Sequence, residues 1–304
     1  MSSKIRETNK KYYSSKGKKI YSDFSTFAQG KTLAKCNALE FVRDFSASKS
    51  PRVVVCEYGI GRGDFAKNFL DEVKKLDRKL YARTRYYLFD FSEKMIDDAR
   101  KNLASHGAVC VFGKFDAAAE QPFLQFDYCR INELLTDLPT LVCQLNNGTL
   151  RELGGKPIGD ASPFVVEFLK RVEDGRAMPF NFIGAEFLAK LCACGKKSFR
   201  IDVFDYGFYS SDEVFEHPVD EWNRLMVRDY GGQLTTDLNV PFVLAHLSAA
   251  GIIAKAEKQK EYCEKVLGKK LALAELKSGL DYVPVKKGDA ISEDDGFYHL
   301  RLGK

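Results

Sequence analysis

The feature that most constrains this chain is an apolar run at residues 53–57 followed by three alternating glycines, Gly59, Gly61 and Gly63. A helical pattern begins at once, over residues 64–70. A buried strand, a glycine turn and a helix form the first unit of a Rossmann-like sheet. Glycines suit this turn because the backbone needs unusual torsion angles and a ligand must approach it closely. The stretch therefore predicts an α/β fold with a ligand at the turn.

The glycine spacing separates two classes of ligand. A dinucleotide fingerprint, G-x-G-x-x-G, would place its third glycine at position 64, which is Asp64. Here the spacing is G-x-G-x-G, and Glu57 stands two residues before Gly59. A carboxylate there would repel a pyrophosphate but suits a ligand that bears an ammonium and a sulfonium. S-adenosyl-L-methionine (SAM) is such a ligand, and the sequence predicts it as the cofactor.

Polar residues follow each of the next predicted strands, at residues 85–90, 108–112 and 126–131. Ligands of open α/β sheets bind at the carboxyl ends of strands. Asp90 is expected to accept hydrogen bonds from both ribose hydroxyls, and Asp116 from an adenine amino group. The predicted cofactor-binding residues are Glu57, Gly59, Gly61, Gly63, Asp90, Phe91, Asp116, Ala117 and Asn132.

Four blocks of the sequence carry a family resemblance. They are Tyr12-Tyr13-Ser14 through Asp23-Phe24-Ser25-Thr26, the glycine block 57–63, Asn132-Glu133-Leu134-Leu135-Thr136-Asp137-Leu138-Pro139, and Asp205-Tyr206-Gly207-Phe208 with residues 232–238. With these blocks the chain resembles the MidA-like SAM-dependent methyltransferases, the family of a mitochondrial complex I assembly factor that methylates a protein arginine. The resemblance spans residues 12 to 267. It implies a class I methyltransferase sheet, mostly parallel, with an antiparallel last strand at residues 296–302.

The resemblance also implies a protein acceptor, with an arginine side chain as the favoured one. A guanidinium is always charged and is a poor nucleophile, so carboxylates are expected to hold it. The predicted catalytic residues are Glu133, Asn132 and Asp205. The predicted substrate contacts are Phe24, Thr26, Asp137 and Tyr206.

Three departures from the family pattern bear on the acceptor. Ser22 replaces a glycine, the Pro-Glu that would follow Thr26 is absent, and Thr136 stands at a family aspartate position with Asp137 one residue later. On a helix, one residue turns a side chain by about 100°. A SAM-binding assembly or scaffold protein without transfer activity is therefore one alternative. An RNA or small-molecule methyltransferase is another, although Asn-Pro-Pro-Tyr and Pro-Cys motifs are absent.

Turn-rich sequence divides the chain into parts. Residues 1–50 are interpreted as a basic N-terminal segment and helix, and residues 51–144 with 198–304 as the SAM-binding core. Residues 145–197 are interpreted as a helical insertion that caps the acceptor site.

Composition favours a cytoplasmic protein. No apolar run approaches the ~20 residues that span a bilayer, so no membrane insertion is expected. The N-terminus lacks the apolar region of a signal peptide. The eight cysteines are expected to be free thiols, and no metal site is predicted because Cys192 and Cys194 have no second close pair.

Residues 1–20 hold seven basic side chains against Glu7 alone, whereas the whole chain has a net charge of +5. A mobile, solvated tail is the favoured interpretation. An electrostatic arm for nucleic acid is the alternative, since Tyr12, Tyr13 and Tyr21 interleave with the lysines. The sequence leaves the oligomeric state and the identity of the acceptor open.

Overall fold

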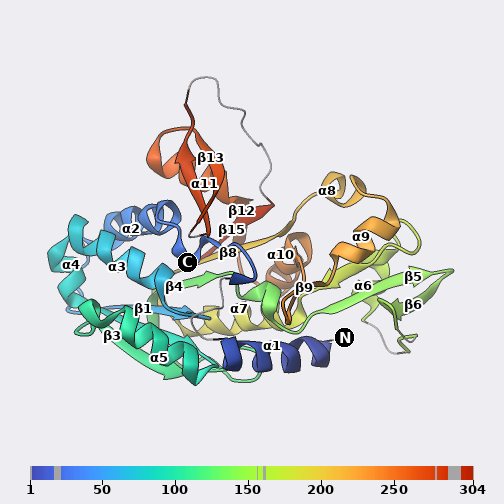
Figure 1. The fold of residues 1–304 in the computed structure, drawn as a ribbon, viewed down its shortest axis with the longest axis horizontal. Helices are drawn as coiled ribbons and strands as arrows, with labels where there is room; N and C mark the ends of the chain where they lie inside the picture. Colours follow the sequence, from blue (N-terminus) through green and yellow to red (C-terminus); the bar gives the residue numbers. More distant parts are fainter. Residues whose placement is uncertain are drawn as a thin grey trace.

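The computed structural model describes residues 2–16, 22–155, 157–159, 162–277, 279–286 and 296–303. Its centre is a sheet in the order β12-β15-β8-β4-β1-β2-β3, with β11 beside the end of β8 (Figure 1). The strands β3, β2, β1, β4 and β8 pair in parallel, whereas β15 runs antiparallel between β8 and β12. The predicted fold class and the antiparallel last strand are confirmed. The sheet strands are β1 Val53–Tyr58, β2 Thr84–Asp90, β3 Cys110–Lys114, β4 Phe126–Asn132, β8 Gly195–Phe208, β11 Leu238–Asn239, β12 Ala254–Lys258 and β15 Phe297–Gly303.

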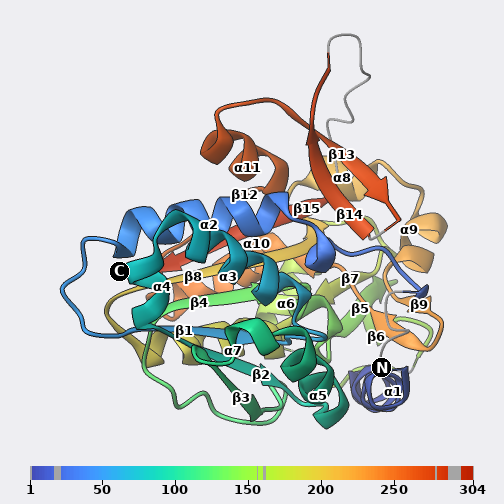
Figure 2. The ribbon, with the colours of Figure 1, turned by 60° about the vertical axis from the view of Figure 1, so that its left-hand side comes forward.

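Helices cover both faces of the sheet. One face packs against α2, α3 and α11 through a core that includes Phe41, Phe69 and Tyr262. The other face packs against α7 and α10, with Phe187 and Phe242 in its core (Figure 2). The helices are α1 Ser2–Lys16, α2 Thr32–Phe45, α3 Asp64–Leu76, α4 Arg78–Arg83, α5 Glu93–Asn102, α6 Pro163–Leu169, α7 Phe182–Cys194, α8 Ser211–Phe215, α9 Val219–Leu225, α10 Val240–Ala249 and α11 Gln259–Leu267, with short 3-10 turns η2 Phe27–Gln29, η3 Ala104–His106 and η4 Leu135–Asp137.

Three helix starts follow from capping side chains. The hydroxyl of Ser92 accepts a hydrogen bond from the backbone N–H of Met95 at the start of α5. The side chain of Asn239 accepts one from the N–H of Phe242 at the start of α10. Asp77 does the same for α4, accepting from Lys79 and Leu80. Asp77 is also the C-cap residue of α3, so the helical pattern that begins at residue 64 ends at Leu76.

The segment predicted as a helical insertion also contains strands. Strands β5 Leu141–Asn146, β6 Thr149–Glu152 and β7 Met178–Phe180 form a small sheet in the order β6-β5-β7. Of its two main helices, α7 packs on the central sheet, because the ring of Phe187 contacts the ring of Tyr58 at the end of β1. The three-part domain division stays a prediction.

The remaining strands form two hairpins. The first hairpin pairs two antiparallel strands beside the carboxyl end of β8: β9 Arg228–Tyr230 and β10 Gln233–Thr235. The second hairpin protrudes from the rest of the molecule (Figure 1) and consists of β13 Leu271–Leu276 and β14 Gly279–Pro284. The backbone N–H of Leu280 in β14 donates to the carbonyl of Thr26, so this hairpin supports the N-terminal segment.

Residues 2–16 of the basic N-terminus form the helix α1, which packs against the rest of the protein. Helix α1 contacts α5, β10 and η4, and it lies across the carboxyl ends of the strands (Figure 2). Ile5, Asn9 and Tyr12 are buried on one face of it. The prediction of a mobile tail was therefore wrong for residues 2–16, whereas Lys18, Lys19 and Tyr21 lie outside the described residues. None of the described helices combines the length and apolar character that crossing a bilayer requires.

Candidate active site

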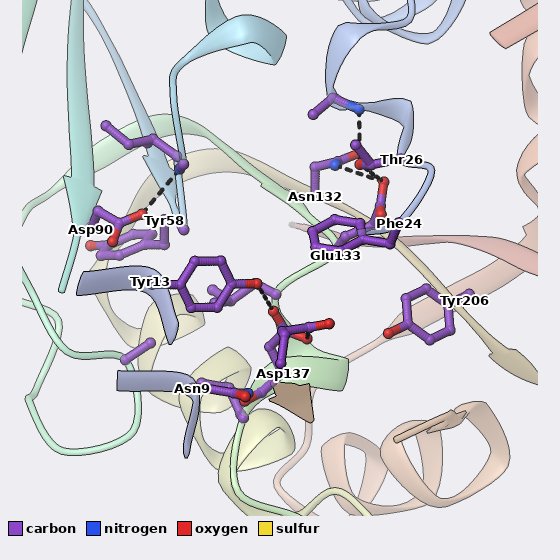
Figure 3. Close-up of a pocket in the computed structure, with 18 of the residues that line it drawn as sticks. Asn9, Tyr13, Phe24, Thr26, Tyr58, Asp90, Asn132, Glu133, Asp137 and Tyr206 are labelled. Atoms are coloured by element: carbon purple, nitrogen blue, oxygen red, sulfur yellow. Dashed lines mark hydrogen bonds between the residues drawn. The ribbon is translucent and has the colours of Figure 1, made fainter. Parts of the chain in front are cut away.

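A cavity of about 520 Å³ opens at the carboxyl ends of β1, β2, β4 and β8, between these strands, α1 and the β9–β10 hairpin. It has two parts. The cofactor side is lined by Glu57, Gly59, Gly61, Asp90, Phe91, Asp116 and Ala117, with Arg6 and Lys10 from α1. The other part holds the predicted substrate contacts, is called the acceptor chamber below, and is lined by Phe24, Thr26, Glu133, Asp137, Tyr206, Arg228, Gln233 and Asp237. Figure 3 shows Asp90 on one side, Glu133 and Tyr206 on the other, and Tyr13 between them.

The glycine turn is shaped by the end of β2. Gly59 and Gly61 have positive φ angles of 72° and 52°, which glycine adopts without strain. The backbone N–H of Gly61 donates to the Asp90 carboxylate at 3.0 Å, and that of Ser92 donates to its other oxygen at 2.9 Å. Burial nevertheless raises the pKa of Asp90 to about 6. Asp90 thus holds the turn and also lines the cavity.

Gly63 has a different task from the two glycines before it. It does not line the cavity, and a Cβ there would lie 2.9 Å from the Cδ1 of Leu103. Its φ of 75° begins α3, so it serves the packing of α3 rather than contact with a ligand. The prediction that Gly63 binds the cofactor is not supported by this placement.

Glu57 also has a partner that the sequence did not reveal. Its carboxylate accepts a hydrogen bond from the Tyr86 hydroxyl and pairs with the Arg130 guanidinium at 3.0 Å. The Cζ of Arg130 lies 3.9 Å from the ring centroid of Phe65. Burial raises the pKa of Glu57 against the opposing charge of Arg130. Glu57 lines the cavity, but Arg130 already neutralises the carboxylate that we expected to face an ammonium.

Asp116 lies under α1. Its Oδ2 accepts from Arg6 at 2.9 Å and from Lys10 at 2.8 Å. Burial alone would raise the pKa of Asp116, but the bonds from Lys10 and Arg6 hold it below its ordinary value. The predicted adenine contact is therefore shared with two cations of α1, which sequence reasoning did not place at the site. The signal for α1 is the helical spacing of Ile5, Asn9 and Tyr12.

Glu133 lies in the acceptor chamber with an unusual backbone conformation and three hydrogen-bond donors to its carboxylate. It has a φ of 49°, in the left-handed region that non-glycine residues rarely adopt. Its Oε1 accepts from the Thr26 hydroxyl at 2.7 Å and from the Asn132 amide at 3.1 Å (Figure 3). It also accepts from the Phe27 N–H at 3.0 Å. Burial raises the pKa of Glu133 in spite of these donors. Strained backbone of this kind clusters at functional sites.

Asp137 is the second carboxylate of the chamber. It accepts from the hydroxyl of Tyr13, which α1 delivers, and from the amide of Gln233 in β10 (Figure 3). Burial raises its pKa to about 7, and the nearby charge of Glu133 adds to this effect. Thr136 points the other way, and its hydroxyl donates to Asp205 at 2.7 Å. The residue after the family position therefore supplies the carboxylate in the cavity.

Asp205 is the predicted catalytic residue that the structure places elsewhere. It is fully buried, does not line the cavity, and accepts from the N–H of Leu135 at 2.8 Å as well as from Thr136. Burial raises its pKa to about 8. It supports η4 from behind, so a direct contact with an acceptor is not supported.

Three features of the residues that line the cavity fit SAM. The Oδ1 of Asn132 is buried and has no hydrogen-bond partner among the described residues, which leaves an acceptor for an ammonium group. A Cβ at Gly59 would lie 2.9 Å from the Cδ1 of Leu134, so the turn has no room for a side chain. The Asp90 carboxylate borders the same space. Asn132, Gly61 and Asp90 would hold the cofactor. Within the described residues, no group of His, Cys, Asp and Glu is placed to hold a metal ion.

Comparisons with known proteins agree with the predicted fold and cofactor. Residues 36–181 match the model of a protein family described as "Putative S-adenosyl-L-methionine-dependent methyltransferase". No protein with a curated description matches the chain in sequence.

Solved structures share the fold. A crystal structure from Burkholderia thailandensis bound to S-adenosyl-homocysteine is 13% identical, with a TM-score of 0.65 over 92% of this chain and 78% of that chain. A second structure from the same organism and superfamily is also 13% identical, with a TM-score of 0.66 over 99% and 86% of the two chains. A complex of DhpI with S-adenosyl-homocysteine is 12% identical, with a TM-score of 0.50 over 99% and 98%. Residues 36–181 are thus similar to a family of SAM-dependent methyltransferases, and S-adenosyl-L-methionine is the cofactor of this chain.

Proposed function

We propose that the protein transfers the methyl group of SAM to a cationic side chain of a protein, with arginine as the favoured acceptor. The observation that carries this proposal is the charge of the acceptor chamber. Glu133, Asp137 and Asp237 all line it, and burial raises the pKa of each. Among the described residues that line the chamber, Arg228 is the single cation. A cationic acceptor would stabilise carboxylates that are otherwise costly to ionise.

The residues divide the work of transfer. Glu133 is assigned to hold the acceptor guanidinium and to concentrate electron density on one of its nitrogens. That nitrogen bonds to the methyl carbon while the methyl–sulfur bond breaks, and the electron pair of that bond stays on sulfur. The same nitrogen loses one proton. Asp137 is assigned to accept this proton, since its pKa of about 7 suits a general base near neutral pH. Positioning supplies much of the rate.

The geometry at Thr136 supports transfer activity over the scaffold alternative. A carboxylate is not lost from the chamber, because Asp137 lines it and holds hydrogen bonds from Tyr13 and Gln233. Thr136 instead secures η4 through Asp205.

Labelled methyl transfer tests this function. The purified protein is incubated with SAM carrying a tritiated methyl group and a cell lysate, and labelled protein is hydrolysed to its amino acids. Methylarginine is expected, with loss of label in Glu133→Gln and Asp137→Asn while calorimetry shows SAM affinity unchanged. Gly61→Val is expected to abolish SAM binding, and Asp97→Asn, on the exposed face of α5, is expected to behave as wild type.

Other outcomes discriminate the alternatives. Label in RNA or a small molecule would replace the protein acceptor. Tight SAM binding without transfer to any lysate component would favour the scaffold alternative. Label in lysine would keep the cationic acceptor and exclude arginine.

A further inference from the structure

Arg228 lies inside the acceptor chamber and is the first residue of β9. Its Nη2 forms a short ion pair with the Oδ1 of Asp237. Its Cζ stands 5.0 Å from the ring centroid of Tyr206, a cation–π distance. Both carboxylate and ring line the cavity. A guanidinium of the chain itself is therefore bound by one carboxylate and one aromatic face within the space that an acceptor would use.

The bonding of Arg228 differs from that of the arginines that hold the fold together. Arg130 donates to Asn37, Glu57 and Tyr86, and Arg176 donates to Val214, His217 and Glu173. Among the described residues Arg228 donates to Asp237 alone, and its buried Nε has no partner, as is also the case for one nitrogen each of Arg130 and Arg176. A guanidinium offers five N–H donors. Most of the donors of Arg228 are thus unused, so the group is held in place by few bonds.

We propose that Arg228 is an internal guanidinium that occupies the place of the acceptor arginine, and that an acceptor binds by displacing it from Asp237 and Tyr206. The inference rests on the proposed function, because it assumes a cationic acceptor. Arg228 keeps Asp237 neutralised while the chamber waits for its acceptor. Arg228 also sets a threshold for binding. The apparent affinity for a ligand is reduced by the fraction of molecules in which Arg228 has left Asp237 and Tyr206. The threshold weakens the binding of any guanidinium, and an arginine on a peptide with further contacts overcomes it at a lower concentration than a small free cation does.

Binding of a guanidinium probe to the SAM-loaded protein tests the displacement without any turnover. The probe is N-acetyl-arginine methylamide, titrated by calorimetry in the presence of saturating S-adenosyl-homocysteine. Arg228→Gln is expected to bind the probe at least about tenfold more tightly than wild type, because Asp237 and Tyr206 are then free. Arg228→Lys, which keeps a cation in the chamber, is expected to stay near wild type. Arg224→Gln is the matched control, since Arg224 lies exposed on the preceding helix and does not line the cavity.

Two further measurements keep the result independent of folding. The double variant Arg228→Gln/Asp237→Asn is expected to lose the gain in affinity, because the carboxylate that holds the guanidinium is gone. In wild type, the ¹⁵N–¹H signal of the Arg228 Nε, assigned by its absence in Arg228→Lys, is expected to shift when the probe saturates the protein. An unshifted signal with bound probe would overturn the inference.

The inference and the proposed function fail in different ways. Probe binding that Arg228→Gln leaves unchanged or weakens would overturn the internal-guanidinium role and leave a cationic acceptor standing. Absence of probe binding in every variant, with S-adenosyl-homocysteine still bound, would overturn both.

Discussion

The hydroxyl of Thr26 donates a 2.7 Å hydrogen bond to the carboxylate of Glu133, across 107 positions of sequence. The same hydroxyl accepts from the N–H of Ala28 at 3.1 Å, so it also begins the η2 turn. Glu133 holds a left-handed backbone conformation immediately after β4. The N-terminal segment therefore fixes the direction in which a strained carboxylate points into the acceptor chamber.

Replacing Thr26 by Val should loosen this arrangement. The isosteric change removes both hydrogen bonds and leaves a buried carboxylate with fewer donors, which costs on the order of 1–3 kcal/mol of unfolding free energy. Methyl transfer is expected to fall while SAM affinity stays within about twofold, because Thr26 lies on the acceptor side. Urea unfolding and labelled transfer measure the two effects. Thr26→Ser keeps the hydroxyl and should retain both properties, and equal losses in Ser and Val would show that the hydroxyl is not responsible.

The pH dependence of transfer should report Asp137. Its folded pKa is raised by burial to about 7, so the carboxyl is neutral below that pH and charged above it. Only the charged form attracts a cationic acceptor and accepts a proton. The kcat/KM for the acceptor is therefore expected to rise from pH 6 to pH 8, with a slope approaching tenfold per unit on the acid side.

Asp137→Asn removes this titrating group and should give a lower, flatter profile. Initial rates with a methylarginine-forming peptide across pH 5.5–9 make the measurement, with Asp97→Asn as control. An unchanged slope in Asp137→Asn would assign the titration to another group.

Helix α1 should control the residence time of the cofactor product. Arg6 and Lys10 tie α1 to Asp116 over the cofactor side. Partly exposed ion pairs contribute up to about 1 kcal/mol each, so Arg6→Gln/Lys10→Gln should speed release of S-adenosyl-homocysteine by up to roughly thirtyfold. Stopped-flow displacement of labelled product measures this rate, and the exposed Lys11→Gln serves as control. Slower release would mean instead that the two cations compete with the ligand for Asp116.

The buried pair of Arg130 and Glu57 should dominate the stability of the core around the glycine turn. Arg130→Met leaves the Glu57 carboxylate buried without its counterion, and breaking such a pair typically costs about 3–5 kcal/mol. Equilibrium unfolding in urea provides the value. Lys170→Met breaks an exposed pair with Glu167 and should cost under about 1 kcal/mol. A similar loss of unfolding free energy in both variants would show that the burial of the Arg130–Glu57 pair does not determine its contribution to stability.

The sequence predicted the parts of the fold that depend on local patterns. The apolar strands and their polar ends are local features, and Asp90, Asp116, Asn132 and Glu133 accordingly lie at one cavity. Spacing and turn chemistry are sufficient there because strands of a parallel sheet end at a common edge.

The missed residues depend on long-range partners. Arg228 and Gln233 reach the cavity on a short hairpin, and a three-residue strand gives little periodic signal. In the sequence Arg130 is a single charged residue within an apolar strand. Its partners, Glu57 and Tyr86, lie on other strands and could not be predicted from local patterns. Asp205 matched a motif but lies one layer too deep, since Thr136 and η4 separate it from the cavity. A motif identifies a residue, whereas packing decides which groups reach the ligand.

The docked position of α1 has a consequence for the order in which the protein is made. The cavity is lined by Arg6 near one end of the chain and by Phe297 near the other. A ribosome releases α1 early, but β8, the β9–β10 hairpin and β15 emerge only after most of the chain has been translated. Until then residues 2–16 lack the surface that α1 covers in the folded protein, and an isolated helix of 15 residues is only marginally stable in water. The binding site can therefore be complete only after β15 has joined the sheet and α1 has docked on the cavity.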